Sequence, residues 1–304
     1  MSASASFDRA AKLDKLATQS GQFAILALDH LRSFATAVRP DAPDTLTPAE
    51  MESMKQGLID GLAASASAVL IDPGLAMGRL DSQASALPVG MILGIEDGDY
   101  EAAAVPPRLL PGWTVERAAN LGADGVKISF YFDPDGDTRP AVSFVEETVR
   151  QCGISGLPLF CEPLVRIDDA TDSRRKVMDG VRRFGSLGAD VLKIQFPGDT
   201  DGAGMQEEWI DACGEADELS ASPWALLSEG RDYEVFRELL TVACRAGCSG
   251  FLGGRAIWRG ATDTSMTSYA DRLSELRLIS TSEGMPWRNH GMTTLTDVTH
   301  QINH

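Results

Sequence analysis

The chain has 304 residues, of which 27 are Lys or Arg and 44 are Asp or Glu, and its formal net charge is −17. A surface of that sign repels nucleic acid and anionic lipid. The sequence shows neither a long apolar run typical of a membrane span nor the basic and then apolar start of a secretory signal, so we expect a soluble, cytoplasmic protein with no nucleic-acid or membrane partner.

Eight short apolar or β-branched runs recur along the chain, and each ends near Gly, Pro or Asp. They lack the alternation of polar and apolar residues that marks a half-exposed sheet, which is typical of strands covered on both faces. We expect each run to be a buried strand. The runs lie at 23–30, 68–74, 91–97, 125–132, 158–165, 191–197, 224–230 and 250–258.

Helical patterns separate these runs. One begins at Thr47, a residue type that caps helices, with Pro48 in the first turn. Another spans 172–189 and closes on Gly188, as a helix that ends in a left-handed glycine does. Strands and helices therefore alternate along the chain, which indicates an α/β protein.

The spacing of the units indicates how the strands are joined. Those that begin at 125, 158, 191 and 224 follow one another every 33 residues, about the size of one strand–helix unit. Eight such units predict a single (β/α)8 TIM barrel over residues 1–304, with a leading helix in 1–20 and a tail from about 280 to 304. The alternative is a doubly wound open sheet, but the GxGxxG loop that often follows its first strand is absent.

Two lysines are predicted to enter the barrel. Alternate side chains of a strand share a face, and in "VLKIQF" (191–196) one set is wholly apolar and belongs against the outer helices. Lys193 is in the other set and therefore points inward. The same test on "GVKISFYF" (125–132) turns Lys127 inward.

Carboxylates stand at comparable positions on other strands. Asp29, Asp72 and Glu96 end the first three strands, and Glu162 lies in the fifth. In barrel enzymes the chemistry occurs at the carboxyl ends of the strands, so these groups should converge on one mouth. Asp72 precedes Pro73 and a glycine, which favours a turn residue over a catalyst.

The seventh and eighth strands end in glycine-rich loops, "LLSEGRD" and "FLGGRAIW". Loops at these positions of a barrel often bind phosphate through backbone N–H groups, and an arginine adds bidentate hydrogen bonds. The side chain of Glu229 is expected to point away from such an anion or to take another partner. The candidate phosphate-binding residues are Ser228, Gly230, Gly253, Gly254 and Arg255.

These groups together predict a reaction. Burial and a second ammonium group nearby destabilise the charged form of a lysine, and the neutral amine can form a Schiff base with a ketone. The iminium then accepts the electron pair of a breaking carbon–carbon bond, while a carboxylate removes the hydroxyl proton. Asp29, Glu96 and Glu162 are the candidates for that carboxylate.

The strings "LALD", "MILGIEDGDYE", "GADGVKISFYFD", "CEPLV", "GADVLKIQFP", "PWALLSEG" and "GFLGGRAIW" resemble, in order, those of class I tagatose 1,6-bisphosphate aldolases and the related sulfofructosephosphate aldolases. The resemblance runs from about residue 20 to residue 260. It implies a (β/α)8 barrel, no metal and no other cofactor, and cleavage of a phosphorylated ketose to dihydroxyacetone phosphate and an aldehyde such as glyceraldehyde 3-phosphate.

Residue by residue, the resemblance implies that Lys193 is the Schiff-base lysine and Lys127 the supporting cation. Glu96 and Glu162 match the acid/base and substrate-orienting carboxylates, and Asp29 matches a substrate-contacting aspartate. Ser228, Gly230, Gly253 and Arg255 match the phosphate-binding strands.

Three alternatives stay open. A sulfofructosephosphate aldolase would give dihydroxyacetone phosphate and sulfolactaldehyde. A magnesium-dependent lyase or isomerase would use Asp29, Glu96 and Glu162 as ligands, because hard cations prefer clustered oxygens. A barrel without turnover would bind sugar phosphates as a sensor. The expected partner is a small-molecule phosphorylated ketose, and we expect a homo-oligomer.

Overall fold

The strands of the computed structural model form one closed parallel barrel in chain order. The structure describes residues 3–81, 86–98, 106–167, 172–200, 206–259 and 266–290. Closure is direct, since Phe23 of the first strand pairs with Gly250 of the last. The predicted (β/α)8 barrel is confirmed and the open sheet is excluded. The strands are β1 (Phe23–Leu28), β2 (Ala68–Ile71), β3 (Gly90–Gly94), β4 (Gly125–Tyr131), β5 (Leu159–Leu164), β6 (Val191–Ile194), β7 (Trp224–Leu227) and β8 (Gly250–Gly253).

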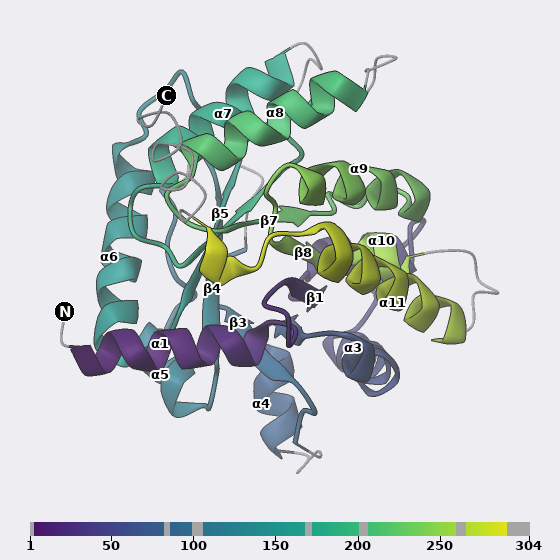
Figure 1. Cartoon of the computed structure of the whole chain (residues 1–304). Helices are drawn as coiled ribbons and strands as arrows, with labels where there is room; N and C mark the ends of the chain where they lie inside the picture. The colour runs from purple at the N-terminus through teal and green to yellow at the C-terminus, as the bar shows by residue number, and fades with distance from the viewer. Residues whose placement is uncertain are drawn as a thin grey trace, which may run out of the picture.

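Helices surround the strands in Figure 1. The α-helices are α1 (Ala3–Leu16), α2 (Arg32–Val38), α3 (Pro48–Leu62), α4 (Pro73–Asp81), α5 (Val115–Asn120), α6 (Arg139–Ser155), α7 (Ser173–Phe184), α8 (Gln206–Leu219), α9 (Tyr233–Arg245), α10 (Arg255–Trp258) and α11 (Met266–Glu283). Short 3-10 turns lie at η1 (Pro43–Thr45), η2 (Ala63–Ser65) and η4 (Trp287–Asn289).

The start of α3 has the predicted cap. Thr47 accepts a hydrogen bond from the backbone N–H of Glu50, and the Glu50 carboxylate accepts one from the backbone N–H of Thr47. The end of α7 differs from the prediction, because the helix stops at Phe184 and not near Gly188. Gly188 has a φ of +95°, a left-handed conformation that turns the chain towards β6.

Most strands end earlier than their apolar runs. β7, for example, stops at Leu227, three residues before the end of the predicted run at Gly230. The last residues of these runs leave the ladder and form the loops at the carboxyl end of the barrel. That end is where barrel enzymes carry their chemistry.

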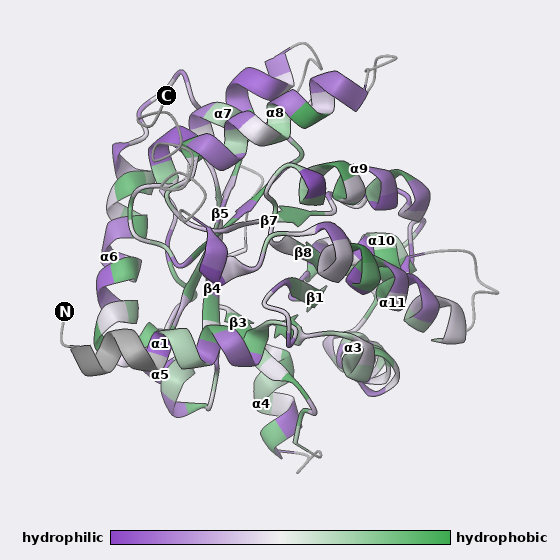
Figure 2. Cartoon of the chain, in the orientation of Figure 1, coloured by the Kyte–Doolittle hydropathy of each residue, from purple (hydrophilic) through white to green (hydrophobic). Residues whose placement is uncertain are grey.

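Two apolar layers hold the barrel together. The outer layer packs one face of each strand against the helices, and a separate inner cluster of side chains such as Phe23, Phe160 and Val191 fills the barrel. Leu13 and Leu16 of α1 belong to the inner cluster, so this helix covers the amino-terminal end of the barrel. Figure 2 shows the strands in apolar colours and polar residues on the outsides of the helices.

The last helix runs further than the predicted tail allowed, since α11 ends at Glu283. Trp287 then returns to the barrel, where its backbone N–H donates to the carbonyl of Gly21 at 2.9 Å. The rest of the predicted tail, 291–304, and the end of the "GIEDGDYE" string at 99–101 lie outside the described residues. No helix among the described residues is long and apolar enough to span a membrane.

Candidate active site

Strand alternation directs both lysines inward. Leu192 and Ile194 lie in the outer layer of the core and Val191 lies in the inner cluster, so Lys193 shares the inner face of β6. On β4, Val126 and Ile128 belong to the outer layer in the same way, which leaves Lys127 inside. Both lysine side chains are almost completely buried.

Three of the predicted carboxylates converge on Lys127. Its Nζ lies 2.8 Å from Asp29 Oδ2, 2.5 Å from Glu96 Oε1 and 3.2 Å from Glu162 Oε2. Glu162 also reaches Lys193, whose Nζ lies 2.9 Å from Glu162 Oε1. The Glu162 carboxylate therefore bridges the two lysines, and it accepts a further hydrogen bond from Ser129 Oγ.

The two lysines are not simply adjacent cations, as the sequence suggests. Carboxylates lie between the two ammonium groups and neutralise their charge. Burial alone would raise the pKa of Glu162, but Lys193 and Lys127 outweigh burial and hold it below its usual range. Lys127, with His30 and Lys193, likewise outweighs burial at Asp29 and holds the pKa of that carboxyl far below its usual range.

The three carboxylates that a magnesium-dependent enzyme would use as metal ligands instead bind an ammonium group. Asp29, Glu96 and Glu162 direct oxygens at Lys127 Nζ, the position that a bound cation would need. Over the described ranges, no group of three or more His, Cys, Asp or Glu side chains is arranged to hold a metal ion.

Asp72 has a structural role, as its sequence context indicated. It pairs with Lys55 of α3 at 2.6 Å, and its other oxygen accepts from the backbone N–H of Leu75 at 3.0 Å in the first turn of α4. Lys55 is fully buried, and its Nζ also lies 5.5 Å from the centre of the Phe34 ring.

A cavity of about 1430 Å³ opens above this cluster. Of the predicted site residues, Asp29, Glu96 and Arg255 line it directly, together with Tyr131 and Arg166. Lys127 is joined to that lining by its ion pairs with Asp29 and Glu96. Glu162 pairs with Lys127 in turn, and Lys193 pairs with Glu162. The wall of the cavity thus combines cationic groups with the carboxylate cluster.

Arg255 has the properties expected of an anion-binding group. Its Nε is buried and has no hydrogen-bond partner among the described residues. Burial and the nearby guanidinium of Arg259 lower its pKa, so an anion at this point would relieve both costs. Gly230 allows the side chain to lie there, because a Cβ on Gly230 would come within 2.7 Å of Arg255 Cζ.

The loop after β7 brings the predicted phosphate residues close to one another. Ser228 Oγ accepts from the backbone N–H of Gly254 at 3.4 Å. Glu229 adopts a φ of +50° and turns aside to accept from Gln195 Nε2 at 2.6 Å and to pair with Arg231 at 3.1 Å. It therefore takes other partners, as expected.

Gly253 has a different position from the other predicted glycines. A Cβ there would meet Ile257 and Phe251 at 3.1 Å, so this glycine allows close packing of the outer layer. Like Ser228, Gly230 and Gly254, it is not among the residues that line the cavity. At Gly254, a Cβ would instead come within 3.0 Å of the His30 ring.

Sequence reasoning did not assign several residues of the cavity wall. Tyr131 shares the inner face of β4 with Lys127, and burial and Glu162 raise its pKa. Arg166 lies over the Tyr131 ring, with its guanidinium 5.4 Å from the ring centre. Lys55 could have been suspected, because it lies at helical spacing from the buried Leu58 and Ile59 on α3.

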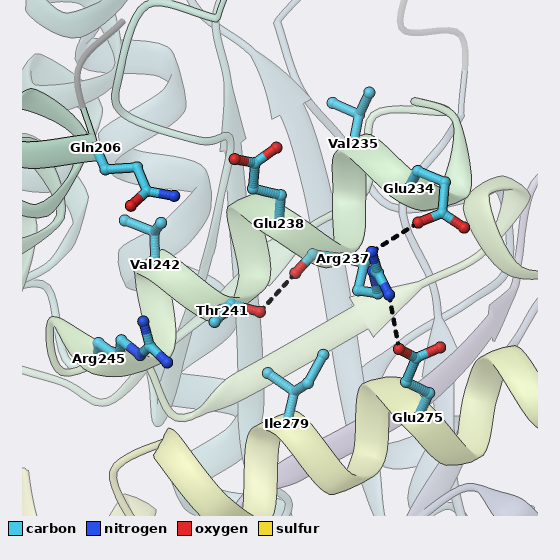
Figure 3. A pocket seen from close by; sticks show the side chains of 10 residues that line it. All are labelled: Gln206, Glu234, Val235, Arg237, Glu238, Thr241, Val242, Arg245, Glu275 and Ile279. Atoms are coloured by element: carbon cyan, nitrogen blue, oxygen red, sulfur yellow. Dashed lines mark hydrogen bonds and ion pairs between the residues drawn. The ribbon is translucent and has the colours of Figure 1, made fainter.

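A second hollow, of about 510 Å³, lies on the outside of the barrel between α8, α9 and α11 (Figure 3). Its central arginine is already paired, since Arg237 lies 2.9 Å from Glu234 and 3.0 Å from Glu275. None of the predicted site residues lines this hollow, so the barrel mouth is the candidate active site.

A sequence profile described as DeoC/LacD family aldolase matches residues 23–260 of this chain. The chain belongs to the DeoC/LacD family of aldolases. This aldolase is a carbon–carbon lyase, as predicted, and its resemblance to tagatose bisphosphate aldolases is confirmed. Tagatose 1,6-diphosphate aldolase 2 of Streptococcus mutans is 28% identical over 90% of this chain and 95% of its own length. The tagatose 1,6-diphosphate aldolase of Lactococcus lactis is 26% identical, covering 90% of this chain and 96% of the relative.

Solved structures of aldolases share the fold. An archaeal fructose 1,6-bisphosphate aldolase superposes with a TM-score of 0.65 at 20% identity, over 89% of this aldolase and 98% of the archaeal chain. The fructose-bisphosphate aldolase from Slackia heliotrinireducens gives a TM-score of 0.71 at 14% identity, over 94% and 90% of the two chains. A third structure has a TM-score of 0.61 at 20% identity, over 89% of this aldolase and 97% of the other chain. It is an archaeal fructose-1,6-bisphosphate aldolase with its catalytic Lys covalently bound to the carbinolamine intermediate of the substrate.

Proposed function

We propose that this protein is a class I aldolase in which Lys193 forms a Schiff base with a phosphorylated ketose. One observation carries the proposal: Lys193 Nζ is buried at the active end of the barrel, and Glu162 is its one ion-pair partner among the described residues. A single hydrogen-bonded carboxylate can accept the proton that a lysine must lose before it attacks a ketone. The carbinolamine bound to the lysine of the archaeal structure agrees with this chemistry.

Lys127 is the less suitable nucleophile. Three carboxylates pair with it, which stabilises its charged form in a buried position. In the proposed mechanism it stays an ammonium group, orients Asp29, Glu96 and Glu162, and offsets the repulsion among the three carboxylates. This matches the role of supporting cation.

The cleavage step follows from the iminium. Lys193 Nζ bonds to the C2 carbonyl carbon of the ketose, and the C2 oxygen leaves as water. A base removes the hydroxyl proton at C4, the C3–C4 electron pair moves to the iminium, and an aldehyde departs. The enamine takes up a proton at C3, and water then releases dihydroxyacetone phosphate from Lys193.

Arg255 provides the phosphate contact of the proposal. Its Nε lacks a partner among the described residues, Gly230 lies against its guanidinium, and Ser228 Oγ accepts from the backbone N–H of the neighbouring Gly254. The substrate we favour is tagatose 1,6-bisphosphate or a close analogue, which would give glyceraldehyde 3-phosphate as the aldehyde. The names of the curated relatives favour this substrate over a sulfosugar phosphate.

The proposal is tested by a coupled assay for dihydroxyacetone phosphate with tagatose 1,6-bisphosphate, fructose 1,6-bisphosphate and sulfofructose phosphate. We expect turnover of a bisphosphate, its loss in Lys193→Met, and no effect of Lys15→Met, whose side chain pairs with Asp124 at the covered end of the barrel. Cleavage by Lys193→Met would contradict the proposal. Activity lost to a chelator and restored by magnesium would favour the metal alternative, and tight binding without aldehyde release would favour the sensor.

A further inference from the structure

His30, the second residue after β1, is the one described histidine that lines the cavity. The other described histidine, His290, lies at the far end of the barrel. Its Nδ1 is buried and faces Asp29 Oδ1 at 3.4 Å. Neither atom has a hydrogen-bond partner among the described residues. A quarter of the His30 side chain is exposed, and the cavity is where that part of the ring faces.

The neighbouring carboxylate selects the tautomer of the ring. Asp29 Oδ1 can only accept a hydrogen bond, because the Lys127 ammonium on its other oxygen keeps the carboxyl ionised. At 3.4 Å the two buried atoms make no hydrogen bond in this structure, and a reorientation of the ring would complete an Nδ1–H to Oδ1 hydrogen bond. The second ring nitrogen, Nε2, then carries a lone pair and has no partner in the described part of the chain.

The charges around His30 keep the ring neutral. Burial is the largest effect and lowers its pKa, and Lys193 of β6, Arg255 of α10 and Lys127 of β4 lower it further. Asp29 opposes them, and the balance is a pKa of about 4. A neutral imidazole can accept a proton, and the imidazolium it becomes would be stabilised by Asp29.

We propose that His30 and Asp29 form a proton-accepting pair, in which His30 Nε2 removes the proton from the substrate hydroxyl next to the bond that is cleaved. The inference rests on the proposed Schiff-base function. The hydroxyl O–H electron pair becomes the second bond of the aldehyde carbonyl, and the C3–C4 pair flows to the iminium on Lys193. The proton on Nε2 returns to C3 of the enamine or to solvent, so His30 is restored in each turnover.

The assignment agrees with the states of the other candidate bases. Glu162 and Asp29 each accept from a lysine, and both have pKa values held below their usual range. Each of these two carboxylates is held ionised beside a lysine ammonium, whereas His30 Nε2 has no hydrogen-bond partner among the described residues. A phosphate dianion at Arg255 would offset one of the cations that depress the basicity of His30.

The test separates Schiff-base formation from cleavage. His30→Gln keeps a hydrogen-bonding side chain that cannot take up a proton, and His30→Leu keeps neither property. Dihydroxyacetone phosphate has no aldehyde portion to release, so borohydride trapping with it reports Schiff-base formation alone. In both variants we expect trapping on Lys193 at the wild-type rate and cleavage of the ketose bisphosphate slowed by about 100-fold or more.

His290→Gln is the matched control, because His290 also faces an aspartate, Asp217, at 3.5 Å but lies at the opposite end of the barrel. It should cleave substrate normally. Cleavage at the wild-type rate by His30→Gln and His30→Leu would overturn the inference, and so would equal losses of trapping and cleavage, which indicate a structural role. Absence of trapping in the wild type would instead refute the Schiff-base function.

Nitrogen-15 NMR of the wild-type protein gives a test that needs no stable variant. The chain has only four histidines, so their ring signals can be separated. We expect His30 to be neutral at pH 7 with its proton on Nδ1. A proton on Nε2, or an imidazolium at this pH, would overturn the inference.

Discussion

Glu162→Gln removes the charge that joins the two lysines while it preserves the size of the side chain. With an effective dielectric of about 20, an ion pair at 2.9 Å contributes ~6 kcal/mol of gross attraction and one at 3.2 Å contributes ~5 kcal/mol. Desolvation and the repulsion from Asp29 and Glu96 offset much of this. Loss of one partner from a buried pair costs about 3–5 kcal/mol net, and that is the destabilisation we expect at pH 7.

The assay is urea unfolding at a fixed protein concentration, with the slope of the transition as a check that both proteins unfold to the same extent. The control is Glu147→Gln, which removes an exposed ion pair with Arg150 and should change stability too little to resolve. Because the pKa of Glu162 is lowered, its contribution is complete above the unfolded value of 4.5 and is lost as the pH falls through the folded value. Equal stability of Glu162→Gln and the wild type at pH 7 would refute the paired cluster.

Three further outcomes follow. Gly230 has a φ of +73°, and the Cβ of Gly230→Ala would come within 2.7 Å of Arg255 Cζ. This variant should displace the guanidinium and raise the KM for the bisphosphate about tenfold, with a stability loss of about 1 kcal/mol. An unchanged KM would argue against Arg255 as the phosphate contact. Asp72→Asn leaves Lys55 buried without its counter-ion and should cost about 3–5 kcal/mol in urea unfolding, most of it recovered in Lys55→Met/Asp72→Asn. The pKa of His30 is about 4 in the folded protein and 6.5 in the unfolded chain, so the unfolded chain takes up the proton more readily. Between pH 7 and pH 4, the stability of the wild type should therefore fall by up to about 3 kcal/mol more than that of His30→Gln. Parallel curves of stability against pH for the two proteins would contradict that pKa.

The architecture and the inward lysines could be predicted because both follow from local patterns. Doubly covered strands are apolar throughout, so a single polar residue such as Lys193 in "VLKIQF" is conspicuous, and alternation fixes the face on which it lies. The βα repeat of 33 residues and the order of the eight runs then left few topologies to consider.

The pairing inside the site could not be predicted, because it depends on how strands far apart in sequence close the barrel. Asp29 and Lys127 are 98 positions apart, yet their charged atoms lie 2.8 Å from each other. Alternation indicates that both side chains enter the barrel, but not that three carboxylates gather on Lys127 while one bridges to Lys193. The expectation that the two lysines repel each other therefore left out the carboxylate that lies between them.

Other residues of the cavity wall could not be predicted from the sequence for a related reason. Lys55 lies in a helix that the sequence predicts well, but its partner Asp72 comes from the next strand and loop. His30 follows a predicted site residue directly, and only the fold shows that its ring faces the cavity and the loop at Gly254.

The central claim is that Lys193, and not Lys127, forms the covalent bond with substrate. Wild-type protein incubated with dihydroxyacetone phosphate and borohydride, then digested and analysed by mass spectrometry, tests this most directly. The account predicts one reduced adduct, on Lys193, and none in Lys193→Met. An adduct on Lys127 or elsewhere, or no adduct in the wild type, would contradict it.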